Sequence, residues 1–93
     1  MSRLVVRMKI LPSDAETNLD DVSKSLSETI PNGMVLNSVS KEPVAFGLYS
    51  LVIDFVLEDS EGQMNKLEEY LERTHGVGQF DVVAMSRRSV TMN

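Results

Sequence analysis

Hydrophobic and polar residues alternate along residues 3–11, and this pattern predicts a strand with one buried and one solvent-facing side. The apolar side consists of Leu4, Val6, Met8 and Ile10. Arg3, Arg7 and Lys9 fall on the other side. Pro12 should end the strand, because proline has no amide hydrogen to donate.

Residues 19–30 repeat apolar side chains every three or four positions, which predicts an amphipathic helix. The apolar stripe consists of Leu19, Val22, Leu26 and Ile30. Asn18 is a favourable N-cap, and Asp20 and Asp21 follow in the first turn, where the helix dipole favours negative charge. The Pro-Asn-Gly sequence at residues 31–33 should end this helix.

A second helix is predicted after residues 60–63. Their sequence, Ser-Glu-Gly-Gln, has the form of a capping box, in which the serine hydroxyl and the glutamine side chain bond backbone amides at the helix start. The apolar stripe of this helix consists of Met64, Leu67, Tyr70 and Leu71. His75-Gly76 should close it, because glycine is the usual residue just past a helix end.

Residues 34–41 and 48–57 are predicted to form two strands joined by a turn. Pro43 should end the first strand, and Gly47 suits the turn because glycine reaches backbone angles that other residues avoid. In the second strand the odd positions are apolar, whereas Ser50 and Asp54 fall on the other side. The apolar positions are Tyr49, Leu51, Ile53, Phe55 and Leu57.

Residues 77–87 form the last predicted strand. Its alternation places Phe80, Val82 and Ala84 against Val83 and Met85. The element order is thus β-α-β-β-α-β, and right-handed crossovers put both helices on one face of a four-stranded antiparallel sheet. We expect a ferredoxin-like α/β (α+β) sandwich that forms a single domain over residues 1–93, with its core within about residues 3–88.

The acidic composition limits the partners. A net charge of −5 argues against nucleic acid, which is recognised through its phosphates by a basic surface, and suits a basic or mixed-charge protein. The chain has no cysteine, so disulfides and thiolate chemistry are excluded. We expect a cytoplasmic protein without membrane contact, because no signal segment and no apolar run near the roughly 20 residues of a membrane span is present.

Residues that could catalyse a reaction or bind a metal are scarce. His75 is the only histidine, and its position at a helix end is explained by the negative end of the helix dipole. Without a second histidine or a cysteine, neither a zinc site nor a nucleophile–base pair can be assembled. The loop at residues 12–16 is acidic and would repel the phosphate of an acylphosphatase substrate. We therefore expect no catalytic residue, metal or cofactor.

RNA binding through the sheet would require exposed aromatic residues on the first and third strands. The first strand has none, and Tyr49 and Phe55 share the apolar side of the third strand. RNA binding is therefore disfavoured.

Residues 42–48 read Glu-Pro-Val-Ala-Phe-Gly-Leu and lead into an apolar strand that closes on Glu58-Asp59. This segment resembles the signature of the archaeal translation elongation factor 1-beta family, and it is similar to the C-terminal exchange domain of the eukaryotic counterpart. The similarity is strongest over residues 42–59 and extends over roughly residues 3–88. It implies a guanine-nucleotide exchange factor that promotes GDP release and GTP loading on the GTPase that delivers aminoacyl-tRNA. Such a factor makes no bonds itself, and we expect it to be a monomer when free.

Phe46 is a large aromatic residue within the predicted turn, and it has two interpretations. It could fold back over the core, or it could protrude and fill a pocket on a partner, as aromatic anchors often do. The resemblance favours the partner contact, because the equivalent phenylalanine of the family packs against the elongation GTPase of the factor 1-alpha type. Pro43, Ala45 and Gly47 belong to the same predicted contact.

Arg87 and Arg88 stand where the last strand runs out, and they could be solvated surface residues or part of the partner contact. Residues 81–88 resemble the eukaryotic ending Asp-Ile-Ala-Ala-Met-Gln-Lys-Leu, whose lysine reaches the magnesium and phosphate site of the GTPase. The carry-over falls on Arg87, where a planar guanidinium replaces a compact ammonium. A second departure is Tyr49-Ser50, where the eukaryotic type has two lysines.

The expected topology places Phe46 and Arg87 at opposite ends of the sheet, roughly 20–30 Å apart at about 3.3 Å per residue. Two separated contacts with the GTPase are therefore expected. The alternative function is a regulatory module of the same fold that pairs through its sheet and binds a small molecule in the seam.

Overall fold

The computed structural model describes residues 2–45 and 47–89, and the side chains of all of these except Arg88 and Ser89. Six elements follow the predicted order. They are β1 (Ser2–Pro12), α1 (Leu19–Thr29), β2 (Met34–Ala45), β3 (Leu48–Glu58), α2 (Gln63–Arg73) and β4 (Val77–Ser89).

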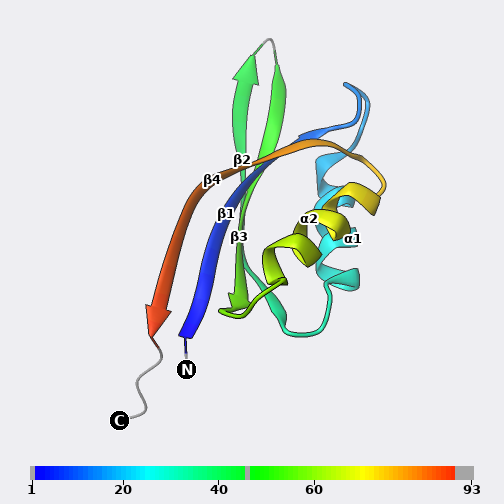
Figure 1. The fold of residues 1–93 in the computed structure, drawn as a ribbon. Coiled ribbons are helices and arrows are strands. Elements are labelled where there is room, and N and C mark those ends of the chain that lie inside the picture. The colour runs from blue at the N-terminus through cyan, green and yellow to red at the C-terminus, as the bar shows by residue number, and fades with distance from the viewer. Residues whose placement is uncertain (1, 46, 90–93) are drawn as a thin grey trace.

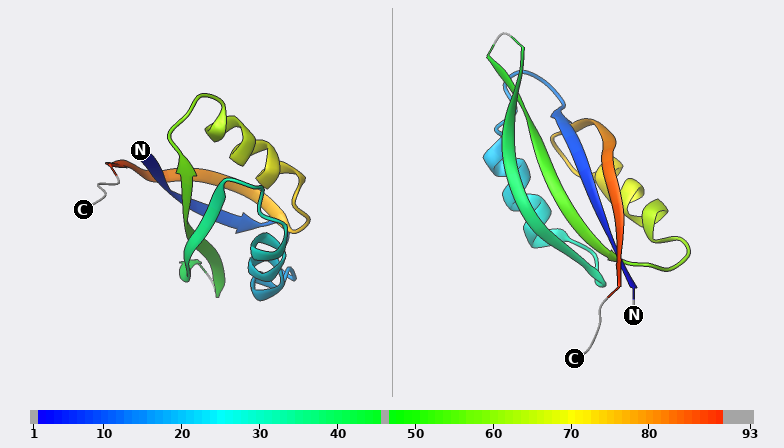
Figure 2. Two further views of the ribbon diagram at one scale, coloured as in Figure 1. Left: turned by 90° about the horizontal axis from the view of Figure 1, so that it is seen from below. Right: turned by 90° about the vertical axis from the view of Figure 1, so that its left-hand side faces the viewer.

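The four strands form one antiparallel sheet in the order β2-β3-β1-β4 (Figure 1). Both helices cover the same face, as Figure 2 shows from two further directions, and the other face is open. The predicted ferredoxin-like α+β sandwich is therefore confirmed. Within the described residues, no helix is long and apolar enough to cross a membrane.

The core lies between the helices and the middle of the sheet. Its fully buried side chains come mainly from the two central strands, whose predicted apolar faces are confirmed over most of their length. These strand residues are Val6, Met8, Ile10, Leu51, Ile53, Phe55 and Leu57. An 11-residue helix is about 16 Å long, whereas an 11-residue strand spans about 36 Å. The helices therefore cover only part of each strand.

The two helix starts differ from each other. Asn18 caps α1 as predicted, because its side chain accepts hydrogen bonds from the amides of Asp20 and Asp21. The predicted capping box of α2 is wrong: the N-cap is Gly62, at φ +87°, and no side chain caps the helix. Among the described residues, Gln63 Oε1 is buried without a hydrogen-bond partner. The left-handed turn at Gly62 replaces the cap geometry that the serine and glutamine require.

Pro43 does not end β2, contrary to the prediction. The strand continues to Ala45, and Pro43 is paired with Tyr49 of β3. The reason is that β2 is an edge strand, which has backbone positions facing away from the sheet where proline loses no ladder hydrogen bond. The β2–β3 hairpin is consequently long, and it turns at Gly47, whose φ is +79°.

Two positions of β3 also differ from the prediction. Tyr49 was expected in the core but is 48% exposed, because the hairpin extends past the region that the helices cover. Ser50 was expected on the wet side but is fully buried. Its hydroxyl donates to the backbone oxygen of Glu42 (3.3 Å), so the buried polar group is satisfied.

Strand β4 contains an irregularity that reverses its alternation. Val82 pairs with Met8 and Ala84 pairs with Arg7, so Val83 is left without a partner in the register. Ala84 therefore lies on the open face with Arg7, and not with Val82 as predicted. Such a bulge re-aims every side chain that follows it.

Tyr70 links the two helices through its hydroxyl, which donates to the backbone oxygen of Leu26 (2.8 Å) and lies 2.8 Å from Thr29 Oγ1. The residue is buried, and this burial raises the pKa of the Tyr70 phenol above its ordinary value, partly offset by the hydrogen bonds. The helix pair is thus joined by a buried polar contact that must remain satisfied.

We expect Tyr70→Phe to lower the free energy of unfolding by about 1–3 kcal/mol, because the carbonyl of Leu26 loses its buried donor. Urea denaturation at pH 7 measures this value. Tyr49→Phe is the matched control, because Tyr49 is half exposed and its hydroxyl is not part of the core. Equal stability of the two variants would contradict this role for the phenol.

The raised pKa of Tyr70 also predicts a loss of stability in alkali. The unfolded chain releases the phenol proton near pH 10, whereas the folded chain holds it to higher pH, so stability falls as the pH rises between the two values. Tyr70→Phe should lose less stability than the parent protein between pH 8 and pH 11. Urea titrations of both proteins at these two pH values give the comparison.

Candidate functional site

The tip of the β2–β3 hairpin projects beyond the rest of the molecule (Figure 1). Its last pair is Ala45 with Leu48, and Pro43, Ala45 and Gly47 of the predicted contact are all exposed there. Phe46, the principal predicted contact residue, lies outside the described residues. Three of the predicted contact residues of the hairpin are therefore accessible to a partner.

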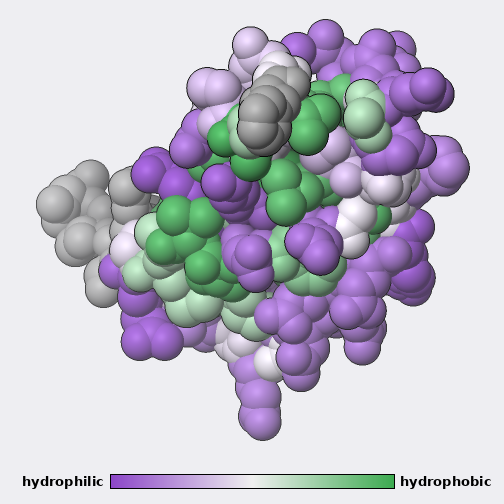
Figure 3. Space-filling view, turned by 90° about the horizontal axis from the view of Figure 1, so that it is seen from above, coloured by the Kyte–Doolittle hydropathy of each residue, from purple (hydrophilic) through white to green (hydrophobic). Residues whose placement is uncertain are grey.

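Exposed apolar side chains surround this tip. Val44, Leu48 and Tyr49 are each more than two-fifths exposed, although their residue types favour burial. Figure 3 looks onto this end of the molecule and shows hydrophobic surface set among polar residues. Exposed apolar groups that are rimmed by polar residues are typical of a protein-binding surface.

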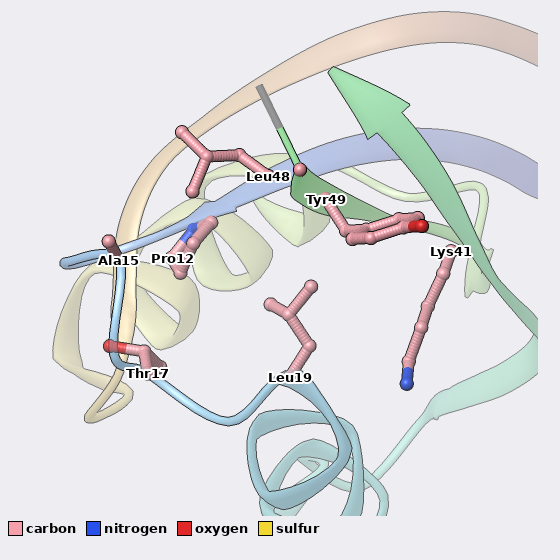
Figure 4. A pocket seen from close by; sticks show the side chains of 8 residues that line it. Pro12, Ala15, Thr17, Leu19, Lys41, Leu48 and Tyr49 are labelled. Carbon is pink, nitrogen blue, oxygen red and sulfur yellow. The ribbon is translucent and has the colours of Figure 1, made fainter. Parts of the chain in front are cut away.

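A hollow of about 470 Å³ lies between the hairpin and the loop that follows β1 (Figure 4). Leu48 and Tyr49 form its wall on the hairpin side, and Pro12 and Ala15 form the opposite wall. Lys41 stands at its edge, where the Lys41 ammonium is 2.7 Å from a carboxylate oxygen of Asp20 at the start of α1. Sequence reasoning missed this feature because it placed Tyr49 in the core.

The end of β4 forms the second candidate region. Arg87 pairs with Leu4 of β1, whose side chain points to the helix-covered face, so Arg87 lies on that face also. Its side chain is nevertheless 66% exposed, and its Nε is 2.5 Å from Oδ2 of Asp59. Met85, two residues earlier on the same face, is 50% exposed. A cation beside exposed apolar surface is thus available to a partner.

Arg88, the other predicted residue here, is described only by its backbone, which pairs with Arg3. Arg3 alternates with Leu4, so the Arg3 side chain belongs to the open face. The predicted role of the Arg88 side chain therefore stays a prediction.

The two regions lie at opposite ends of the sheet. Leu4 pairs with both Arg87 and Leu57, and Leu57 is nine residue steps along β3 from Leu48 at the hairpin tip. At about 3.3 Å per residue this is about 30 Å, and the molecule measures 46 × 22 × 18 Å overall. The predicted separation therefore holds for the hairpin stem.

The open face of the sheet is mixed in polarity. Arg7 donates two hydrogen bonds to the Asp54 carboxylate (2.8 and 3.2 Å), and the bonds and charge of Asp54 raise the pKa of Arg7. Tyr49 and Phe55 belong to the other face, so the described part of the open face has no aromatic residue for stacking on bases.

Histidine, aspartate and glutamate side chains occur throughout residues 2–45 and 47–89. No group of three or more histidine, aspartate or glutamate side chains there could hold a metal ion. His75 is exposed and lines a shallow hollow with Asp14 and Asp21.

Comparison with known proteins identifies the family of the chain. The sequence matches the EF-1 guanine nucleotide exchange domain family over residues 5–87, which include the hairpin and Arg87. It is 36% identical to elongation factor 1-beta of Hyperthermus butylicus and 34% identical to that of Desulfurococcus amylolyticus. Each match covers 96% of this chain, and 98% and 100% of those proteins. Elongation factor 1-beta of Methanothermobacter thermautotrophicus is 33% identical over 94% of this chain and 98% of its own length. The chain therefore belongs to the EF-1 guanine nucleotide exchange domain family, and it is a guanine-nucleotide exchange factor of translation elongation.

Proposed function

We propose that the chain promotes GDP release from elongation factor 1-alpha by contacting this GTPase at two places, the hairpin tip and the end of β4. The observation that carries the proposal is the exposed guanidinium of Arg87, which lies beside exposed apolar surface about 30 Å from the hairpin. The proposed contact residues are Pro43, Ala45, Phe46, Gly47, Arg87 and Arg88.

An exchange factor acts through a difference in affinity. It binds the nucleotide-free GTPase more tightly than the nucleotide-bound form, and by reciprocity it weakens nucleotide binding by the same factor. Each tenfold change requires about 1.4 kcal/mol of differential contact. Contacts that form only with the empty GTPase are therefore the ones that drive release.

Arg87 is suited to such a contact because a cation competes with the magnesium ion that holds the nucleotide phosphates. Its charge can take a place in the nucleotide site only when the metal and the phosphates have left. The apolar side chains of the hairpin, including Leu48 and Tyr49, supply affinity that depends less on the state of the nucleotide site.

This division of roles requires no bond-making chemistry, so the chain acts by binding and not as an enzyme in the narrow sense. Its acidic charge of −5 supports a protein partner over nucleic acid. The proposal places the chain in the cytoplasm, as a monomer when free.

We expect Arg87→Ala to slow factor-stimulated GDP release at saturating factor by about 10- to 100-fold, because one charged contact of about 1.5–3 kcal/mol is lost in the empty state. Binding to the GDP-bound GTPase should change by less than tenfold. Stopped-flow release of a fluorescent GDP measures the rate. Arg73→Ala is the control, because Arg73 is an exposed arginine at the end of α2 and is not one of the proposed contact residues. An unchanged rate for Arg87→Ala would refute this assignment.

Phe46→Ala should weaken binding to the GTPase and slow GDP release. An aromatic anchor of an interface contributes about 2 kcal/mol or more, or about 30-fold in affinity. The affinity for the nucleotide-free GTPase can be measured by titration, and GDP release by the same stopped-flow assay at subsaturating factor. Val35→Ala is the control, because Val35 is an apolar residue that is 50% exposed and lies near the start of β2, away from the hairpin tip. Wild-type affinity in Phe46→Ala would exclude the hairpin as an anchor.

A further inference from the structure

Asp59 is the residue that contacts the guanidinium of Arg87. It follows directly after the end of β3 at Glu58, and its Oδ2 lies 2.5 Å from Nε of Arg87. The contact joins the end of a central strand to an edge strand on the helix-covered side of the sheet.

Asp59 is the more buried member of this ion pair, and backbone hydrogen bonds hold the chain around it. The Asp59 amide donates to the backbone oxygen of Ser2 (3.3 Å), and the next amide, of Ser60, donates to the oxygen of Glu58 (2.9 Å). The Asp59 side chain is 23% exposed, whereas that of Arg87 is 66% exposed. An anchored, mostly buried acid therefore holds a base that projects into solvent.

The nitrogen used in this contact leaves Arg87 able to act on a partner. Nε is the nitrogen nearest the aliphatic stem, and the two terminal nitrogens lie further out along the side chain. A guanidinium has five N–H donors in a rigid planar arrangement, so fixing one of them sets the direction of the others. A lysine ammonium would have to offer its single nitrogen to both Asp59 and the partner.

The bulge at Val83 is what brings Arg87 to Asp59. Without it, continued alternation from Val82 would place Arg88 on the helix-covered face and Arg87 on the open face. Two independent features, the bulge and the anchored carboxylate, thus act on the same side chain.

We propose that Asp59 is a positioning residue for exchange, which holds Arg87 through Nε and directs its terminal nitrogens toward the nucleotide site of the GTPase. The inference rests on the proposed function of Arg87 and adds a residue to it. A guanidinium that is already oriented loses less side-chain freedom when the complex forms, so the gain appears in the complex with the empty GTPase.

The test uses the full chain with GDP-loaded elongation factor 1-alpha and follows release of a fluorescent GDP at saturating factor. Asp59→Asn removes the charge and keeps the shape, and it should slow release about two- to fivefold, the range of an exposed ion pair. Glu58→Gln is the matched control: it changes the charge equally one residue away, and Glu58 pairs with Arg3 on the open face. Glu58→Gln should leave the rate unchanged.

The double variant separates positioning from a structural effect. If Asp59 acts through Arg87, Asp59→Asn should have no further effect in the Arg87→Ala protein. An equal slowing in both backgrounds would overturn the inference, and so would an unchanged or faster rate in Asp59→Asn alone, since Asp59 would then be neutral or would restrain Arg87. Thermal unfolding of each variant detects any loss of folding, and Asp59→Glu, which keeps the charge, should recover part of the rate.

The proposed function and this inference can fail separately. If the parent protein does not accelerate GDP release, the function itself is wrong. If the parent protein, Glu58→Gln and Asp59→Asn all accelerate GDP release to the same extent, only the role of Asp59 is wrong.

Discussion

Packing of two short helices against one face of a longer sheet is the constraint on which the rest of the structure depends. Burial is complete over the middle of β1 and β3, where apolar side chains meet both helices. The strands continue beyond this region because they rise about twice as far per residue as a helix does. The hairpin tip and the end of β4 are therefore exposed parts of a sheet whose centre is rigidly held.

The described ion pairs lie on the open face of the sheet and near its two exposed ends. Arg7 is paired with Asp54 on the open face, Lys41 with Asp20 beside the hairpin, and Arg87 with Asp59 at the end of β4. A chain with a net charge of −5 cannot attract the nucleotide site of a GTPase through a broad basic surface. The proposed function depends instead on the placement of one cation, Arg87, by the sheet.

Sequence reasoning was most successful where a side chain has one dominant requirement. The alternation from Leu4 to Ile10 identified a buried strand face, and Asn18 identified a helix start, because burial and capping are local effects. The ferredoxin-like order followed from the sequence of elements and the handedness of crossovers.

The errors arose where tertiary structure decides. Pro43 lies within a strand because that strand is an edge, and Tyr49 is exposed because the helices end before it. The capping box failed since Gly62 adopts a left-handed turn. The contact between Asp59 and Arg87 joins residues far apart in the chain, and nothing in the local pattern indicated the bulge that brings them together. The motif around Phe46 was recognised, but its side chain lies outside the described residues.

Val83 has no partner in the register with β1, and the residue after Arg87 is a second arginine. If a change upstream abolished the bulge and slid β4 by one position, the neighbouring arginine would move onto the face that Arg87 now occupies. Most one-residue slips in a strand exchange an apolar side for a polar one. Here a slip would exchange one guanidinium for another, so a relative of different strand length could keep the same charge in the same place.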